Sequence, residues 1–109
     1  MERLKKTEDF GRVYKKGKSK ADRNLVLFYL PTEEEERRLG ISVSKKVGNS
    51  VVRHRTKRRL KEAARLNEDA FPKKGDFVIL ARNHAAFADY HELETSLLHL
   101  LERMKERQV

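Results

Sequence analysis

The residues best suited to chemistry in this sequence are cations, and they are concentrated in one segment, residues 45–65. This segment holds nine Lys or Arg residues and a single Glu, whereas the rest of the chain holds 17 basic and 16 acidic residues. Nearly all of the net charge of +9 therefore comes from about one fifth of the chain. Clustered charge of this kind indicates a polyanionic partner, because cations that neutralise phosphates release counterions from a nucleic acid.

The same segment has the periodicity of an amphipathic helix, expected to begin at the turn and cap residues 48–50 and to end near residue 67. The apolar stripe consists of Val52, Thr56, Leu60, Ala63 and Leu66. The opposite arc carries Arg53, His54, Lys57, Arg58, Lys61 and Arg65, and the stripe is flanked by Arg55 and Arg59. Like charges spaced in this way destabilise an isolated helix by roughly 0.2–0.5 kcal/mol per pair. A helix that tolerates this repulsion is expected to meet phosphate.

Other chemistries lack the residues that they need. The sequence has no Cys, no phosphate-binding loop and no nucleophile elbow. Its four His residues do not form a zinc-protease pattern, and His91 and His99 lie too far apart on one expected helix to share an ion. We therefore expect no catalytic side chain and no metal site in the protein.

Length and composition fit one small domain, residues 1–109, with a thin core under a charged surface. Hydrophobic residues make up 38% of the chain and charged residues 39%. The longest apolar run, residues 25–30, is too short to span a membrane. The basic N-terminal residues are not followed by the apolar stretch of a signal peptide. Since the absence of Cys also suits a reducing compartment, we expect a cytoplasmic protein.

Two further helices are expected outside the basic segment. The first would be capped by Thr7, would place Phe10, Val13 and Tyr14 on one face, and would end at Gly17. The second would begin at a capping box, residues 89–92, and continue as a Leu-rich amphipathic helix to the C-terminus.

Three segments have the composition of strands. They are residues 24–30, 39–44 and 76–82. The second alternates cleanly, with apolar residues on one face and small or polar residues on the other. The order helix, strands, helix, strand, helix predicts an α+β fold, a two-layer sandwich in which helices pack on a small mixed sheet.

Residues 42–62 resemble the signature segment of the bacterial ribonuclease P protein family. In that family a strand ends in Lys-Lys or a similar pair and is followed by Val/Ile-Gly-Asn-Ala-Val, an Arg-Asn-Arg core and Lys-Arg. This sequence has Lys45-Lys46, then residues 47–51, then Arg53-His54-Arg55 and Lys57-Arg58. His54 departs from the family Asn, so a role that requires the amide does not carry over. The first helix, the strand at residues 23–30, the last strand and the last helix also resemble the family, so the resemblance covers nearly the whole chain.

The resemblance implies a fold of the ribosomal protein S5 domain 2-like type, with the order α-β-β-(β)-α-β-α. It implies a protein subunit of the ribonuclease P ribonucleoprotein, an endoribonuclease that removes the 5′ leader from precursor tRNA. The RNA subunit would perform the chemistry with Mg2+, and the protein would hold no cofactor of its own. The implied partners are ribonuclease P RNA and precursor tRNA, with no membrane, and the isolated protein would be a monomer.

The resemblance also implies two groups of binding residues. Those expected to bind RNA are Lys45, Lys46, Arg53, His54, Arg55, Lys57, Arg58, Lys61 and Arg65. Those expected to line a cleft for the 5′ leader are Phe10, Tyr14, Phe28, Ser42 and Ser44. Unpaired bases stack on aromatic rings with little sequence preference, and small Ser side chains allow close approach. Helical spacing alone would instead place Phe10 in the core, so both uses of the aromatic residues remain open, whereas Tyr29 and Phe77 are assigned to the core.

Two other functions are compatible with the residues alone. A ribosomal or other structural RNA-binding protein would share the size, the pI near 10.0 and the basic helix, but would not assist tRNA processing. A DNA-binding module would place the basic helix in the major groove. The sequence lacks the preceding helix and short turn of a helix-turn-helix, since a strand leads into the basic helix instead.

Overall fold

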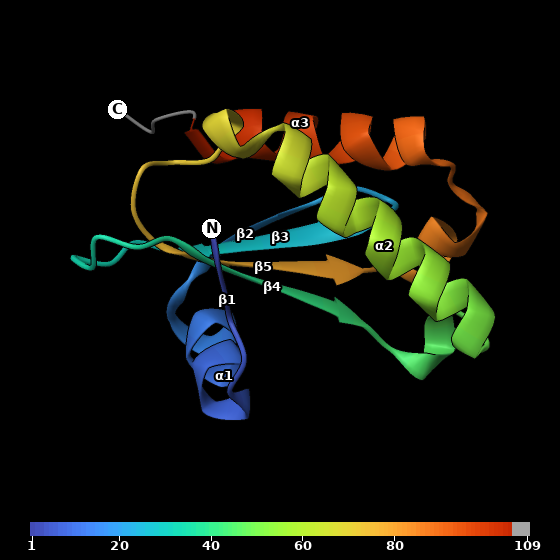
Figure 1. Ribbon diagram of the computed structural model, residues 1–109, viewed down its shortest axis with the longest axis horizontal. Coiled ribbons are helices and arrows are strands. Elements are labelled where there is room, and N and C mark those ends of the chain that lie inside the picture. Colours follow the sequence, from blue (N-terminus) through green and yellow to red (C-terminus); the bar gives the residue numbers. More distant parts are fainter. Residues whose placement is uncertain (106–109) are drawn as a thin grey trace.

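The computed structural model describes residues 1–105, and it shows a five-stranded sheet between two layers of helices (Figure 1). The strands are β1 (Glu2–Arg3), β2 (Lys18–Ala21), β3 (Leu25–Leu30), β4 (Arg38–Val43) and β5 (Asp76–Ala81). The α-helices are α1 (Thr7–Lys16), α2 (Ser50–Leu66) and α3 (Tyr90–Lys105). Three short 3-10 helices are η1 (Lys45–Val47), η2 (Glu68–Ala70) and η3 (Asn83–Phe87). Helices α2 and α3 lie on one face of the sheet and α1 lies on the other. This confirms the expected α+β class, and α1 adds a layer to the two that were expected.

The sheet is mixed and has the order β1-β4-β5-β3-β2. Strand β5 pairs parallel with β4 and antiparallel with β3. Parallel neighbours need a crossover connection, and α2 supplies it by carrying the chain from the end of β4 back toward the start of β5. The basic helix therefore has a fixed place over the sheet.

The main core lies between the sheet and helices α2 and α3. Its fully buried side chains include Leu25, Leu27, Leu60, Phe77, Ile79, Leu93, Leu97 and Leu100. Burying a side chain of this size stabilises the fold by about 1.5–3 kcal/mol, which outweighs the repulsion between any one pair of cations on α2. Across residues 1–105, each helix is too short or too polar to span a bilayer.

The buried stripe of α2 differs from the expected one at its end. Thr56, Leu60 and Ala63 are buried as expected, but Leu66 is 56% exposed and Ala64 is buried instead. At 100° per residue, Ala64 lies about 40° from Leu60 around the helix, whereas Leu66 lies about 120° away. The expectation for Leu66 was wrong because its position faces away from the sheet.

Of the three expected helix caps, the one at Thr7 is wrong and the other two are confirmed. Thr7 is the first residue of α1, and the cap position is Lys6, whose side chain makes no capping hydrogen bond. Asn49 does cap α2, since its Oδ1 accepts from Val52 N at 3.0 Å. Asp89 caps α3 by accepting from Glu92 N at 2.8 Å.

The expected order allowed an optional third strand between the first two helices. Strand β2 is this additional strand. Its residues, Lys-Ser-Lys-Ala, are mostly exposed and lack apolar alternation, so the sequence did not mark them as a strand. The segment becomes a strand because it pairs antiparallel with β3 along its whole length.

Helix α1 docks on the second face of the sheet through a small apolar cluster. Val13 and the half-buried Phe10 pack with Leu4 and Val78. The Phe10 ring lies on Gly40, where an added Cβ would come within 2.4 Å of the ring. The close approach of α1 therefore requires glycine at position 40.

We predict that Gly40→Ala destabilises the protein by about 1–3 kcal/mol, because the methyl group displaces the Phe10 ring and α1 with it. Thermal or urea unfolding measures the effect. Gly11→Ala is the matched control, since a Cβ at Gly11 has no neighbour within 4 Å. That change in an exposed helix is expected to stabilise by roughly 0.5–1 kcal/mol. Two variants of equal stability would contradict this role of Gly40.

Candidate RNA-binding surfaces

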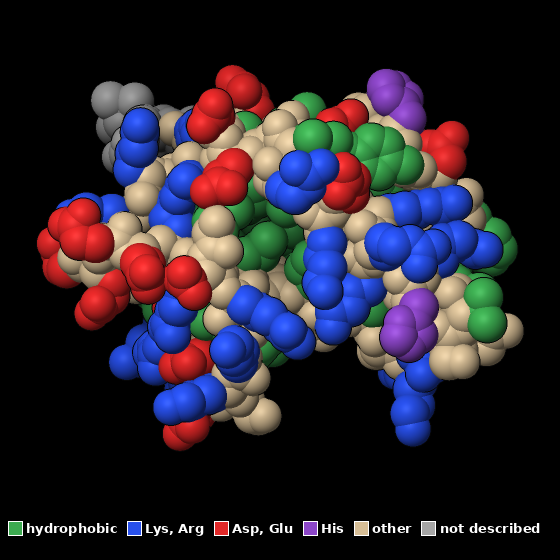
Figure 2. Space-filling view, in the orientation of Figure 1, with side chains coloured by type: hydrophobic (Ala, Val, Ile, Leu, Met, Phe, Trp, Pro, Cys, Tyr) green, Lys and Arg blue, Asp and Glu red, His purple; other side chains and the backbone are tan. Residues whose placement is uncertain are grey.

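The exposed side of α2 forms a cationic ridge. We define this ridge by His54, Arg58, Lys61 and Arg65, which all have exposed side chains. Figure 2 shows Lys and Arg side chains gathered over this helix. Arg65 is also held within the helix, because its Nη2 donates to Glu62 at 2.6 Å. This hydrogen bond lowers the pKa of Glu62, so the carboxylate stays charged and offsets one cation of the ridge.

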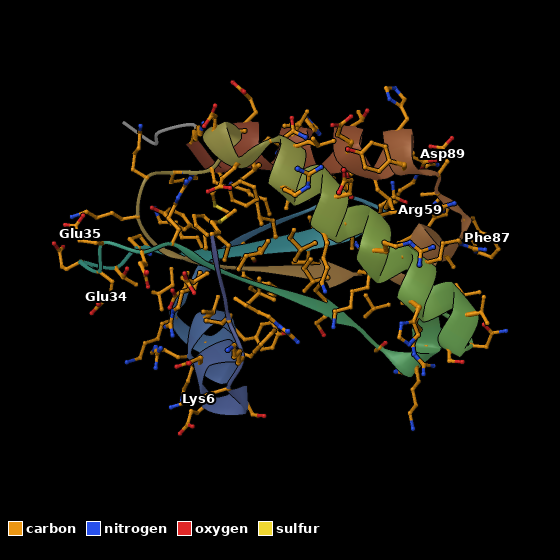
Figure 3. All side chains as sticks on the ribbon, viewed as in Figure 1. Lys6, Glu34, Glu35, Arg59, Phe87 and Asp89 are labelled. Carbon is orange, nitrogen blue, oxygen red and sulfur yellow. The ribbon has the colours of Figure 1, made fainter. Side chains whose placement is uncertain are left out.

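The other arginines of α2 are half-buried beside the ridge. Arg53 donates to the carbonyl oxygen of Gly48 at 2.9 Å, which ties its guanidinium to the loop before the helix. Arg55 has a buried Nε with no acceptor within residues 1–105. Arg59 donates to the carbonyl oxygen of Ala88 at 2.8 Å and so connects α2 to the end of η3. Figure 3 shows Arg59 reaching toward the segment between Phe87 and Asp89.

The structure places the nine expected RNA-binding residues on two consecutive elements. Lys45 and Lys46 are exposed in η1, between the end of β4 and the start of α2. Lys57 is half-buried on the side of α2 that borders β4. The cationic surface therefore runs along α2 and continues to the sheet edge.

The opposite face of the sheet presents apolar and small side chains, and strand register aligns them in rows. Phe28, Val78 and Gly40 are aligned across β3, β5 and β4, and this row lies under α1. The next row on the same face contains Val26, Leu80 and Ser42. These three side chains are all half-exposed, so α1 leaves an open floor on the sheet. We call this floor, together with the aromatic residues beside it, the sheet groove.

Three aromatic rings stand at the α1 side of the sheet groove. Tyr14 packs edge-on against Phe28, with ring centroids 4.9 Å apart, and Phe10 lies 6.3 Å from Tyr14. Phe10 and Phe28 are half-buried in the cluster under α1, whereas Tyr14 is 39% exposed. Phe10 and Phe28 therefore pack against the cluster under α1, and Tyr14 presents part of its ring to solvent. The use of these residues in a leader cleft stays a prediction.

The far end of the sheet groove combines the expected Ser44 with residues that sequence reasoning missed. A cavity of about 680 Å³ lies there, lined by Arg23, Val26, Ser44, Leu80, Arg82 and His84, among others. The buried Asn24 orients the His84 ring, since Asn24 Oδ1 lies 2.9 Å from His84 Nδ1. Asn24 Nδ2 donates to Ser96, which makes Oδ1 the acceptor for His84 Nδ1–H. No local pattern could reveal this, because His84 lies 60 residues after Asn24.

An ion-pair cluster holds α1 against the sheet. Arg38 binds the buried carboxylate of Asp76 with two hydrogen bonds, of 3.0 and 2.8 Å. Its remaining nitrogen donates to Asp9 of α1 at 3.3 Å, and Arg12 donates to Asp9 at 2.7 Å. The cluster therefore positions the helix that carries Tyr14.

Known proteins with similar sequences and structures identify the family. The model of the Ribonuclease P family matches residues 1–105. The chain belongs to the ribonuclease P protein family. A ribonuclease P protein component from Alkaliphilus metalliredigens is 47% identical over 103 residues, which cover 94% of this chain and 93% of the relative.

Solved ribonuclease P proteins share the fold described above. The protein from Staphylococcus aureus, at 2.0 Å, has a TM-score of 0.88 and 38% identity, and the match covers 96% of each chain. The protein from Thermotoga maritima has a TM-score of 0.86 and 31% identity, over 97% of this chain and 100% of that one. The expected family and fold are confirmed, and the roles of individual side chains remain predictions.

We predict that Asp9→Asn weakens the docking of α1 in a pH-dependent manner. The hydrogen bond from Arg12, chiefly, holds the pKa of Asp9 below its usual 3.8. A carboxylate with a lowered folded-state pKa contributes stability above its unfolded pKa and loses it as the pH falls. The stability deficit of Asp9→Asn should therefore be largest above about pH 5 and shrink toward about pH 3.

Urea unfolding across this pH range measures the deficit. Glu8→Gln is the control, because it removes a carboxylate from the same first turn and so matches the loss of helix-dipole stabilisation. A deficit that is constant with pH, or equal in both variants, would be inconsistent with the Arg12–Asp9–Arg38 contacts.

Proposed function

We propose that this ribonuclease P protein binds the ribonuclease P RNA through η1 and α2 and holds the 5′ leader of precursor tRNA in the sheet groove. It acts as a monomeric subunit in the cytoplasm and assists the endonucleolytic maturation of tRNA 5′ ends. The observation that carries this proposal is the presence of two surfaces suited to RNA on opposite faces of one small sheet. A single domain can then contact the catalytic RNA and its substrate at once.

The α2 surface suits a folded RNA. It combines exposed cations with arginines whose planar guanidinium groups can bind a phosphate through two hydrogen bonds. His54 stands on the exposed ridge, where it can donate or accept a hydrogen bond in place of the family Asn. The α2 helix follows β4 and η1 directly, which gives no support to a helix-turn-helix mode of DNA binding.

The sheet groove suits an unpaired strand. The Tyr14 ring offers a stacking surface for a base, and the half-exposed Val26, Leu80 and Ser42 offer a shallow floor without bulky charged groups. Arg23 and Arg82 at the far end can neutralise backbone phosphates. Stacking and backbone contacts bind single strands with little sequence preference, which suits leaders of varied sequence.

The protein has no side chains arranged for hydrolysis in this proposal. Within residues 1–105, no three His, Asp or Glu side chains lie together as metal ligands. The Mg2+ expected in the holoenzyme is assigned to the RNA subunit, which is the catalytic part. The protein contributes affinity and the position of the substrate.

Reconstitution with a bacterial ribonuclease P RNA tests the α2 surface. We expect wild-type protein to stimulate cleavage of precursor tRNA at low Mg2+. Lys46→Ala with Arg58→Ala should weaken the complex and reduce the slope of log affinity against log salt by about two, because each phosphate contact contributes about one. Lys73→Ala with Lys105→Ala removes the same charge from exposed positions outside both surfaces. An equal loss in both double variants would refute a localised RNA-binding surface.

Tyr14→Ala tests the sheet groove. We expect it to remove most of the affinity that the leader adds, since stacking is worth about 1–3 kcal/mol per base. Tyr14→Phe keeps the ring and should retain this affinity. Binding of mature tRNA, which lacks the leader, is the internal control and should be unchanged. A similar loss for leader-bearing and mature tRNA would show that Tyr14 does not act on the leader.

A further inference from the structure

A third candidate surface lies at the free edge of the sheet, where it borders the cationic ridge at Lys61 and the sheet groove at Phe10. A cavity of about 610 Å³ opens there between the N-terminal segment, β4 and α2. Its rim carries the cations Arg3, Lys5, Lys57 and Lys61, together with Glu2. Figure 2 faces this region and shows Lys and Arg side chains around a hollow in which hydrophobic side chains are visible. We call this cavity the edge pocket.

The floor of the edge pocket is apolar. Leu39 and Ile41 of β4 contribute to it, and Phe10 reaches it from α1 across Gly40. These side chains belong to elements far apart in the sequence, and the positions of β1 and α1 on the sheet bring them together. The pocket therefore combines an apolar floor with a cationic rim.

The strand edge adds polar groups to this floor. Strand β1 pairs with β4 only at Arg38 and Leu39, and Leu4 N donates to the Leu39 carbonyl oxygen at 2.9 Å. In a parallel pair, alternate residues direct both backbone groups to the same neighbour, so the N–H and C=O of Ile41 point toward this edge as those of Leu39 do. Within residues 1–105, no strand continues the pairing past Leu39.

These three features match the phosphate and the base of a nucleotide. The cations suit a phosphate, the apolar floor suits the face of a base, and an adjacent N–H and C=O suit the hydrogen-bonding edge of a base. A peptide strand added to the edge would satisfy the backbone groups of β4, but it would leave the cationic rim without a role. Charge complementarity therefore favours RNA as the occupant.

We propose that the edge pocket binds one unpaired nucleotide of the ribonuclease P RNA, with its phosphate near Lys57 and Lys61 and its base against Ile41. This inference rests on the proposed function, since it specifies how part of the catalytic RNA is held. In this pocket the backbone of β4 contacts the edge of a base, whereas the cationic ridge of α2 contacts phosphates. The N-terminal segment and α2 then contact the same nucleotide from two sides.

Hydrogen–deuterium exchange resolved to single amides tests the proposal in the full-length protein saturated with ribonuclease P RNA. The Ile41 amide should exchange up to about tenfold more slowly in the complex, because a hydrogen bond to a base replaces one to water. The amides of Gly40 and Ser42 face β5 in the same alternation and serve as internal references, with little change expected.

Two variants with the same loss of charge separate the edge pocket from general RNA binding. At a concentration of ribonuclease P RNA that saturates each variant, Lys61→Ala should abolish the added protection of Ile41. Arg58→Ala, on the same helix but outside the pocket, should retain it. Cleavage of precursor tRNA is assayed in the same samples. Stimulated cleavage without protection of Ile41 would overturn the edge pocket and leave the proposed function intact.

Other outcomes are equally informative. Protection that increases with protein concentration in the absence of RNA would overturn the proposal, because it would show a second copy of the chain adding a strand to β4. If the protein neither binds the RNA nor stimulates cleavage, the proposed function fails, and the inference that depends on it fails as well.

Discussion

The parallel pairing of β4 with β5 is the constraint on which the rest of the structure depends. Two adjacent parallel strands cannot be joined by a tight turn, so the chain must cross one face of the sheet, and α2 is that crossing. Strand β5 also pairs with β3, and the row from Phe28 through Val78 to Gly40 forms the surface on which α1 docks. One pairing thus sets the position of the cationic helix on one face and of the groove on the other.

The cationic helix shows how local repulsion and global packing are balanced. Isolated α2 would carry several unfavourable pairs of like charge, each small, with Glu62 as its acidic residue. In the folded protein Leu60 and Ala63 are fully buried, and Arg59 donates to a backbone carbonyl group of another segment. Packing therefore stabilises a helix whose exposed side is left available for phosphates. Arg59 thus makes a contact within the fold, whereas the side chain of its neighbour Arg58 is exposed.

The position of α1, the helix that carries Tyr14, depends on the neutralisation of a buried carboxylate. The buried Asp76 would be costly without a partner, and Arg38 satisfies both of its oxygens. The third nitrogen of Arg38 then reaches Asp9, so the group that neutralises a buried carboxylate also anchors a surface helix. Together with the contact of Phe10 on Gly40, this cluster sets how closely α1 approaches the sheet and how much of the sheet remains open.

Local features of the fold and the candidate sites were predictable wherever a sequence pattern reports burial directly. The alternation in β4, the apolar stripe of α2 and the Asn49 cap all follow from short-range periodicity or local hydrogen bonding. Strand β2 was uncertain for the opposite reason, because its Lys-rich residues become a strand only through pairing with β3. Leu66 was misplaced because a stripe read from the sequence does not show where the helix leaves the sheet.

The sequence by itself determined the charge of this protein, its cationic helix and its resemblance to the ribonuclease P family, because these depend on residue types and short spacings. The tertiary structure alone decided which residues share a surface. Strand register aligned Val26, Leu80 and Ser42, and pairing limited to Arg38 and Leu39 left the edge beside Ile41 open. A buried Asn24 oriented His84 from 60 residues away. Such sites arise from contacts between distant segments, and a sequence pattern of short range contains no record of them.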